Sequence, residues 1–173
     1  YNITSLSNNS VHSIYQDKEG TIWIGTFGSG INYYNRLLFQ FEHYKQIPNE
    51  KNCLSNNNVN VFFEDGDNLW IGTEGGLNIL NRKTGNYKFY KHSLENKKSI
   101  SADAIWSIFK DSRGNMWIGT WAGGLNLFDK KSETFTHFRY NNNNNEGISS
   151  DNIFGITEDS CFLYLGTMNG GLC

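Results

Sequence analysis

Aspartate recurs at four regularly spaced places in this chain, and two of the four have a glutamate beside them. Successive aspartates are 48, 46 and 48 residues apart, and the residues are Asp17, Asp65, Asp111 and Asp159, with Glu64 and Glu158 as neighbours. Paired carboxylates can act as acid and nucleophile in a glycoside hydrolase. Each aspartate, however, ends a strand-like run just before a turn, where Asp can bond the backbone that follows it. We therefore interpret all four as turn residues, and no catalytic residue is predicted.

The sequence lacks other patterns that support catalysis or metal binding. The three cysteines, Cys53, Cys161 and Cys173, have no CxxC spacing, and no Ser-His-Asp or phosphate-binding pattern occurs. His43 and His137 stand at equivalent places in separate repeats, which are expected to diverge in space. Neither a metal site nor a cofactor is therefore predicted.

A second set of residues has the chemical variety of a binding surface. The residue that follows WIGT, or YLGT in the last copy, changes each time: Phe27, Glu74, Trp121 and Met168. The start of each preceding strand-like run adds His12, Asn60 and Trp106, with Phe154 in the last copy. Aromatic rings that stack on an apolar face, with Asn and Glu as hydrogen-bonding groups, are the usual mix in a ligand pocket. The alternative is that some of the aromatics, above all Trp106 and Phe154, only pack between repeats.

A repeat of about 47 residues positions these side chains. Trp23, Trp70 and Trp117 are 47 residues apart, and one further step leads to Tyr164. The third repeat reads AIWSIFKD, NMWIGT, GLNLFD and TFTHFRY, which are four runs of strand length separated by Gly, Asn, Asp and Ser. No segment has a sustained helical period. Each repeat is therefore predicted to form a four-stranded antiparallel meander.

The predicted fold class is all-β, with the repeats as blades of a β-propeller. The first run of each repeat is apolar or small on both faces, which predicts a strand covered on both sides by neighbouring copies. Blades are expected at residues 6–47, 54–93, 100–140 and 148–173, the last one incomplete, so about three and a half blades are present. Propellers have roughly four to eight blades, and we expect the chain to be a piece of a longer protein.

Composition narrows the choice of partners. Hydrophobic residues make up 38% and aromatic residues 15% of the chain, and the formal net charge is −2 with the basic residues scattered. Without a basic patch, a nucleic-acid partner is not expected. The polar run of residues 141–145 predicts a solvated loop between repeats. No stretch reaches the roughly 20 apolar residues of a membrane span.

The repeat resembles the two-component regulator propeller repeat. The pattern is carried by VHSIYQDKEGTIWIGTFGSGIN, VNVFFEDGDNLWIGTEGGLN and IWSIFKDSRGNMWIGTWAGGLN, and it extends over essentially the whole chain. The first copy departs from it with Ser29 at a Gly-Gly position, the second is one residue shorter in its hairpin, and the fourth has YLGT. The resemblance implies a seven-bladed propeller, often one of two in tandem, in the periplasmic sensor of a hybrid two-component histidine kinase.

The resemblance also implies a function. Such sensors detect breakdown products of complex glycans and signal through a transmembrane helix, so an oligosaccharide or other small ligand and a non-enzymatic domain are expected. The resemblance assigns no ligand-binding residues by position, so the predicted site rests on the variable residues given above. The remaining blades of the parent propeller, and a second parent molecule in a homodimer, are further expected partners.

A propeller lectin or an interaction scaffold remains an alternative, and a propeller glycosidase is a third. A lectin with one sugar per blade would need the same pocket residues in each repeat, and Phe27, Glu74 and Trp121 differ. Residues 1–173 expressed alone are expected to self-associate, because an open arc of blades leaves apolar faces and strand edges uncovered. The apolar run Leu37–Phe39, in place of a polar turn, adds to this expectation.

Overall fold

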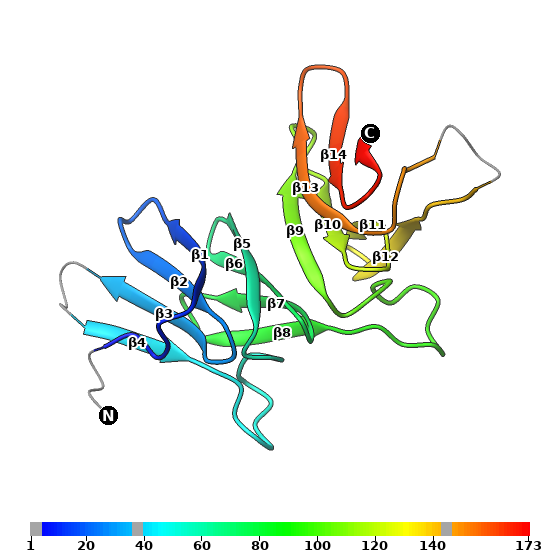
Figure 1. Cartoon of the computed structure of the whole chain (residues 1–173). Helices are drawn as coiled ribbons and strands as arrows, with labels where there is room; N and C mark the ends of the chain where they lie inside the picture. The colour runs from blue at the N-terminus through cyan, green and yellow to red at the C-terminus, as the bar shows by residue number, and fades with distance from the viewer. Residues whose placement is uncertain (1–4, 36–39, 143–146) are drawn as a thin grey trace. The chain divides into compact units, whose positions relative to one another are not determined.

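The regular secondary structure of the described residues consists of β-strands. The computed structural model describes residues 5–35, 40–142 and 147–173, and the strands pair in chain order as antiparallel meanders (Figure 1). The first sheet contains β1 (Val11–Gln16), β2 (Ile22–Thr26), β3 (Gly30–Asn35) and β4 (Gln40–Tyr44). The second contains β5 (Val59–Asp65), β6 (Asn68–Thr73), β7 (Gly76–Asn81) and β8 (Asn86–Tyr90).

The third sheet contains β9 (Ile105–Lys110), β10 (Met116–Thr120), β11 (Leu125–Asp129) and β12 (Thr134–Phe138). The fourth has three strands, β13 (Ile153–Glu158), β14 (Leu163–Thr167) and β15 (Gly171–Leu172). The prediction of three complete four-stranded blades and part of a fourth is therefore confirmed. The apolar run Leu37–Phe39 lies outside the described residues, as do residues 143–145 of the asparagine run.

The chain divides into two units, residues 1–89 and 90–173, and each holds two of the sheets. In the first unit β5 packs against β1 and β2, and in the second unit β13 packs against β9 and β10. The first core contains Trp23, Ile31, Leu54, Val59, Leu69, Ile71 and Leu80. The second contains Leu125, Ile153 and Leu165, with Trp117 and Ile148 against them.

The expectation that every first strand is buried on both faces is wrong for β1, and also for β13, in which Phe154 and Thr157 are exposed. The residues of β9 are all buried or half-buried, whereas Ile14 of β1 is 68% exposed. The reason is that β5 packs on the face of β1 that carries Tyr15, so that Ile14 points the other way.

The serine, threonine and asparagine that recur in every complete repeat form one buried chain of hydrogen bonds. In the second blade the Asn78 amide donates to Ser55 Oγ (2.9 Å), the Ser55 and Thr73 hydroxyls are 3.2 Å apart, and the Thr73 hydroxyl donates to Gly76 O (2.8 Å). The other complete blades repeat it with Ser7, Thr26 and Asn32, and with Ser101, Thr120 and Asn126. Because an orphaned buried partner costs about 1–3 kcal/mol, these residues are explained by blade construction.

In the first, third and fourth blades the recurrent aspartate closes the first hairpin with side-chain hydrogen bonds, and in the second blade Asp65 ends β5 just before the turn. Asp111 Oδ1 accepts the backbone N–H groups of Arg113 (3.0 Å) and Asn115 (2.8 Å), while Oδ2 accepts the indole N–H of Trp117 (2.8 Å). Gly114 completes the turn with a φ of 86°, which an L-residue rarely adopts. In the fourth blade the Tyr164 hydroxyl donates to Asp159 Oδ2 (2.7 Å), so YLGT retains the bond that WIGT makes with indole.

The glycine of WIGT makes room for the next blade. A Cβ at Gly119 would lie 2.7 Å from Ile153 Cγ2 and 2.1 Å from Ser107 Oγ. Val59 approaches Gly25 in the same way in the first unit, at 3.3 Å from such a Cβ. The buried branched residue that opens β5 or β13 therefore packs directly on the glycine of the preceding blade.

Candidate functional site

The predicted ligand residues of the first strands occupy a bulge. In all four blades the strand register skips one residue at this position, so that, for example, Ile105 pairs with Thr120 and Ser107 with Gly119. The residues left over are His12, Asn60, Trp106 and Phe154. Because a bulge lifts one residue out of the ladder and redirects its side chain, this position is separated from the regular packing of the strand.

A backbone hydrogen bond holds the residue after each threonine beside this bulge. The N–H groups of Phe27, Glu74, Trp121 and Met168 donate to the carbonyl groups of Ser10, Asn58, Ala104 and Asn152 at 2.9–3.0 Å. Each acceptor directly precedes a first strand. The two kinds of predicted site residue, far apart in the repeat, are therefore neighbours within every blade.

In the first unit the side chains of each blade meet in pairs. The rings of His12 and Phe27 are 5.3 Å apart between centroids, and the Asn60 amide donates to Glu74 Oε1 at 2.8 Å. Phe27 is 53% exposed. One pair thus offers aromatic surface and the other offers a carboxylate beside an amide.

In the second unit an aromatic cluster joins the third and fourth blades. The ring centroid of Trp106 is 6.1 Å from that of Trp121 and 4.8 Å from that of Phe154, and Trp121 lies edge-on to Phe154 at 5.9 Å. Trp121 and Phe154 are each 40% exposed, and Met168 is exposed as well. Phe154 occupies the same repeat position as Trp106.

The packing interpretation fits Trp106, whereas the ligand-binding interpretation fits Trp121 and Phe154. Trp106 is half-buried and its indole nitrogen is enclosed with no hydrogen-bond partner among the described residues, which fits a packing role. Trp121 and Phe154 keep a large part of their rings exposed. Exposed rings supported by a buried one form a firm apolar platform on which a ligand can stack.

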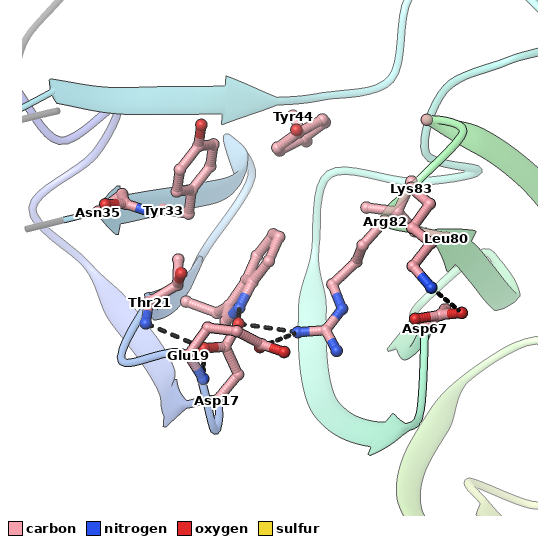
Figure 2. A pocket seen from close by; sticks show the side chains of 12 residues that line it. Asp17, Glu19, Thr21, Tyr33, Asn35, Tyr44, Asp67, Leu80, Arg82 and Lys83 are labelled. Atoms are coloured by element: carbon pink, nitrogen blue, oxygen red, sulfur yellow. Dashed lines mark hydrogen bonds and ion pairs between the residues drawn. The ribbon is translucent and has the colours of Figure 1, made fainter. Parts of the chain in front are cut away.

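The other end of the strands carries an arginine cluster that sequence reasoning missed. Arg82, just after β7, bonds Asp17 Oδ2 (2.9 Å) and Glu19 Oε2 (3.1 Å) of the first blade, and Glu64 Oε1 (2.6 Å) of its own blade. The Tyr15 hydroxyl donates to Glu64 Oε2 at 2.6 Å. Figure 2 shows the Arg82 side chain reaching across to Asp17 and Glu19.

The charges in this cluster stabilise one another. Burial opposes ionisation of Glu64, but hydrogen bonds from Tyr15 and Arg82 and the charge of Arg82 outweigh it and hold the pKa of Glu64 below its usual range. Burial, together with the Glu64 carboxylate, raises the pKa of Tyr15 to about 12. The contact between Arg82 and Asp17 joins residues 65 positions apart, so the repeat pattern alone could not predict it. The sequence indicates it only through a basic residue at one position of each complete repeat, which is Arg36, Arg82 or Lys130.

A cavity of about 360 Å³ lies beside this cluster in the first unit (Figure 2). One wall is aromatic and consists of Trp23, Tyr33 and Tyr44. The charged lining consists of Asp17, Glu19, Asp67, Arg82 and Lys83, and the remainder is Thr21, Asn35, Leu80 and Gly85. The cavity lies at the β1–β2 turn, at the opposite end of β2 from Phe27.

His43 and His137 contact backbone carbonyl groups of loop residues. His43 Nε2 contacts the carbonyl oxygen of Ser29, and His137 Nε2 lies 2.7 Å from Ser99 O. Among the described residues no group of three or more His, Cys, Asp or Glu side chains could hold a metal ion. Within the same part of the chain, there is also no helix with the length and apolar character to cross a membrane.

Comparison with known proteins connects these features to a family. Residues 5–28, 53–75 and 99–122 match the family described as two component regulator propeller. Each matched segment runs from the serine loop through the first two strands to the residues around the glycine turn. The segments therefore contain both the blade-building residues and the variable residues at the bulge and after the threonine.

Two solved structures and one protein sequence are similar to this chain, each over a different share of its length. The extracellular domain of the hybrid two-component system BT3049 from B. thetaiotaomicron is 29% identical with a TM-score of 0.84, over 98% of this chain and 23% of that one. The corresponding domain of BT4673 from the same organism is 27% identical with a TM-score of 0.76, over 96% and 21%. Histidine kinase P4 of Formosa agariphila is 35% identical over 72 residues, which is 41% of this chain.

The chain spans 5% of that kinase and less than a quarter of either extracellular domain. The repeats and the fold of the chain are nevertheless of the same kind as those of these proteins. The chain forms an all-β propeller domain of the type found in two-component sensors, and not an enzyme. The three matched repeats and these similarities confirm the resemblance to the two-component regulator propeller repeat that the sequence predicted.

Proposed function

We propose that the chain is part of the ligand-sensing region of a hybrid two-component sensor, and that the bulge and the loop after each second strand bind an oligosaccharide. The observation that carries the proposal is the aromatic cluster of Trp106, Trp121 and Phe154, whose two outer rings are 40% exposed. Phe27 and the Asn60–Glu74 pair occupy the same position in their blades. Rings that stack on the apolar face of a sugar, with amide and carboxylate groups for its hydroxyls, suit this class of ligand.

In this proposal the domain lies in the periplasm, and the histidine kinase lies on the cytoplasmic side of the inner membrane. Its support is the similarity to the extracellular domains of BT3049 and BT4673 and to Histidine kinase P4. Ligand binding would change the propeller or its contacts with the rest of the parent protein, which includes the remaining blades and, in a homodimer, a second copy. Blades that are rigid on their own, held by buried hydrogen bonds, would transmit such a change as whole bodies.

A lectin is the second candidate, favoured by the recurrence of the bulge in every blade. Against it stands the chemistry of the four pairs, because His–Phe, Asn–Glu, Trp–Trp and Phe–Met cannot present the same groups to four identical sugars. The stoichiometry of binding separates the two candidates. One composite site binds a single oligosaccharide per propeller, whereas a lectin binds several sugars independently.

A glycan array probed with the full-length protein that carries this chain tests the proposal. We expect one class of oligosaccharide to bind, with a stoichiometry of one in titration calorimetry. Trp121→Ala and Phe154→Ala should each weaken binding at least about tenfold, because each removes a stacking surface.

Phe89→Ala is the matched control, since Phe89 is an exposed aromatic residue on β8 outside the predicted site. Its affinity should equal that of the wild type. Failure of every glycan on the array to bind, or binding that Trp121→Ala and Phe154→Ala leave unchanged, would refute the proposed function.

A further inference from the structure

We propose a second ligand site, for a neutral saccharide unit, in the cavity between the first two blades at the β1–β2 turn. The cavity is bounded by Trp23, Tyr33 and Tyr44 of the first blade and by Arg82 and Lys83 of the second (Figure 2). This inference does not rest on the proposed function, because the cavity is at the other end of the strands from the bulge residues.

The three rings of the aromatic wall contact one another. The Tyr33 and Tyr44 rings stack with centroids 5.9 Å apart and planes 29° apart, and Trp23 is tilted by 36° from Tyr33 and by 33° from Tyr44. Rings this close together line one side of the cavity and leave no room for a ligand between them. An aromatic surface on one side suits a pyranose ring, which presents its C–H groups on one side, better than it suits a spherical ammonium group that needs rings around it.

The opposite wall offers a hydrogen-bond donor and an acceptor side by side. Arg82 uses Nη1 for Asp17 and Glu19, and Nη2 for Glu64 and Gly66 O. Asp17 and Glu64 are almost fully buried, whereas the Glu19 side chain is 68% exposed. Since an exposed ion pair contributes at most about 1 kcal/mol, Glu19 can turn away without breaking the cluster.

A vicinal pair of hydroxyl groups fits the gap that this movement opens. One hydroxyl would accept the freed N–H of Arg82, and its neighbour would donate to the Glu19 carboxylate. A carboxylate ligand prefers two parallel donors, and release of Glu19 frees one Nη1 N–H of Arg82. The Lys83–Asp67 pair on the rim (2.9 Å), exposed on both sides, offers a second exchangeable donor and acceptor.

The charge of the surroundings also selects against an acid. Four carboxylates, Asp17, Glu19, Glu64 and Asp67, surround the two cations Arg82 and Lys83. The excess of two negative charges disfavours anionic ligands. The cavity volume of about 360 Å³ falls in the range of small-molecule pockets, roughly 300–1,000 Å³.

The second unit supplies a matched position without the site. Arg113 occupies the place of Glu19 in the third blade's hairpin, so that the acceptor is replaced by a cation. The cavity beside it is smaller, about 240 Å³, and no tyrosine lines it. One saccharide unit per propeller segment is therefore expected at this end of the strands.

Saturation-transfer NMR with the full-length protein tests the inference. The probes are methyl glycosides of glucose, galactose and mannose, with glucuronate and glucosamine as charged counterparts. We expect transfer to at least one neutral glycoside and at least about tenfold weaker binding of glucuronate. Glu19→Ala, which removes an exposed acceptor, and Tyr33→Leu, which removes part of the aromatic wall, should each weaken binding about tenfold.

Two further variants complete the test. Arg113→Ala changes the matched hairpin position and should not affect binding of the neutral glycoside. Trp121→Ala changes the other site and distinguishes the two sites. Loss of binding in Trp121→Ala alone would place the glycoside in the bulge site and overturn this inference while supporting the first proposal. Absence of transfer to every neutral glycoside, or glucuronate binding as tight as theirs, would also overturn it.

Discussion

Thr120 and Trp121 are adjacent in the chain but have opposite surroundings. Thr120 is fully buried, and its hydroxyl donates to Gly124 O at 2.8 Å, whereas Trp121 is 40% exposed. In every blade a threonine that recurs is followed by a residue that varies. A residue that closes a hydrogen-bonded network cannot vary without orphaning its partners, while its exposed neighbour is free to serve recognition.

The aspartates give a first prediction at this scale. Asp111→Asn should lower the free energy of unfolding by about 1–3 kcal/mol, because an amide cannot accept both the backbone N–H groups and the indole N–H that the carboxylate accepts. Urea denaturation followed by tryptophan fluorescence measures the change. Arg113→Gln in the same turn is the control and should stay within about 0.5 kcal/mol of the wild type.

The effect of Asp111→Asn should depend on pH in a defined direction. Burial alone would raise the pKa of Asp111, but hydrogen bonds from Trp117, Asn115 and Arg113 outweigh it and hold the pKa below the ordinary 3.8. Because the folded pKa is depressed, this stabilisation is present above the unfolded pKa and is lost as the pH falls through the folded value. The difference between wild type and variant should therefore shrink as the pH falls below about 4; a difference that grows there would contradict the assignment.

The residue scale also shows where sequence reasoning ends. The turn role of the aspartates and the binding role of variable positions were argued from spacing, and the turn bonds of Asp111 and Asp159 are confirmed. The ligand role of Phe27, Glu74, Trp121, Met168, His12, Asn60 and Trp106 stays a prediction. The Arg82 cluster was not predicted, because Asp17 and Glu19 belong to another blade and become neighbours of Arg82 only when β5 packs on β1.

At the scale of elements, the glycine of WIGT sets how closely two blades approach. Gly119→Ala should destabilise the fold by about 1–3 kcal/mol, since the added Cβ would lie 2.7 Å from Ile153 Cγ2. Gly155→Ala is the matched control: it lies in β13 of the same unit, and a Cβ there meets nothing within 4 Å. The control should be neutral or slightly stabilising. Equal destabilisation by both variants in chemical denaturation would contradict the packing role of Gly119.

The strands were largely predictable, whereas the bulges were not. Apolar runs between Gly- and Asp-containing turns identified the four meanders, because a strand buried against its copies leaves a strong local pattern. The extra residue of a bulge leaves no such pattern, since it depends on the backbone hydrogen bond from the loop after the second strand. The exposed face of β1 was also missed, because its sequence resembles that of β9.

At the scale of the molecule, the apolar surface of residues 1–173 predicts self-association. Ile14, Phe162, Leu94 and Leu172 are each more than two-thirds exposed, far beyond what a soluble surface needs. We expect this chain, expressed alone, to form oligomers in light scattering, and a form extended by further blades to be monomeric or dimeric. Ile14→Ser with Phe162→Ser should reduce the association. A monomer at high concentration with a sharp cooperative melt would show that the chain is self-sufficient. The total of seven blades stays a prediction.

The central claim is that recurrent residues build the blades and variable residues bind the ligand. The five tryptophans divide accordingly: Trp23, Trp70 and Trp117 belong to WIGT, while Trp106 and Trp121 belong to the predicted site. Fluorine NMR of the full-length protein labelled with 5-fluorotryptophan, each signal assigned by a Trp→Phe substitution, tests the claim during titration with the best oligosaccharide from the array. We predict that the signals of Trp106 and Trp121 shift while those of Trp70 and Trp117 do not, and that Trp23 responds only if the second site is filled. Shifts at Trp70 and Trp117 with Trp106 and Trp121 unchanged would contradict it.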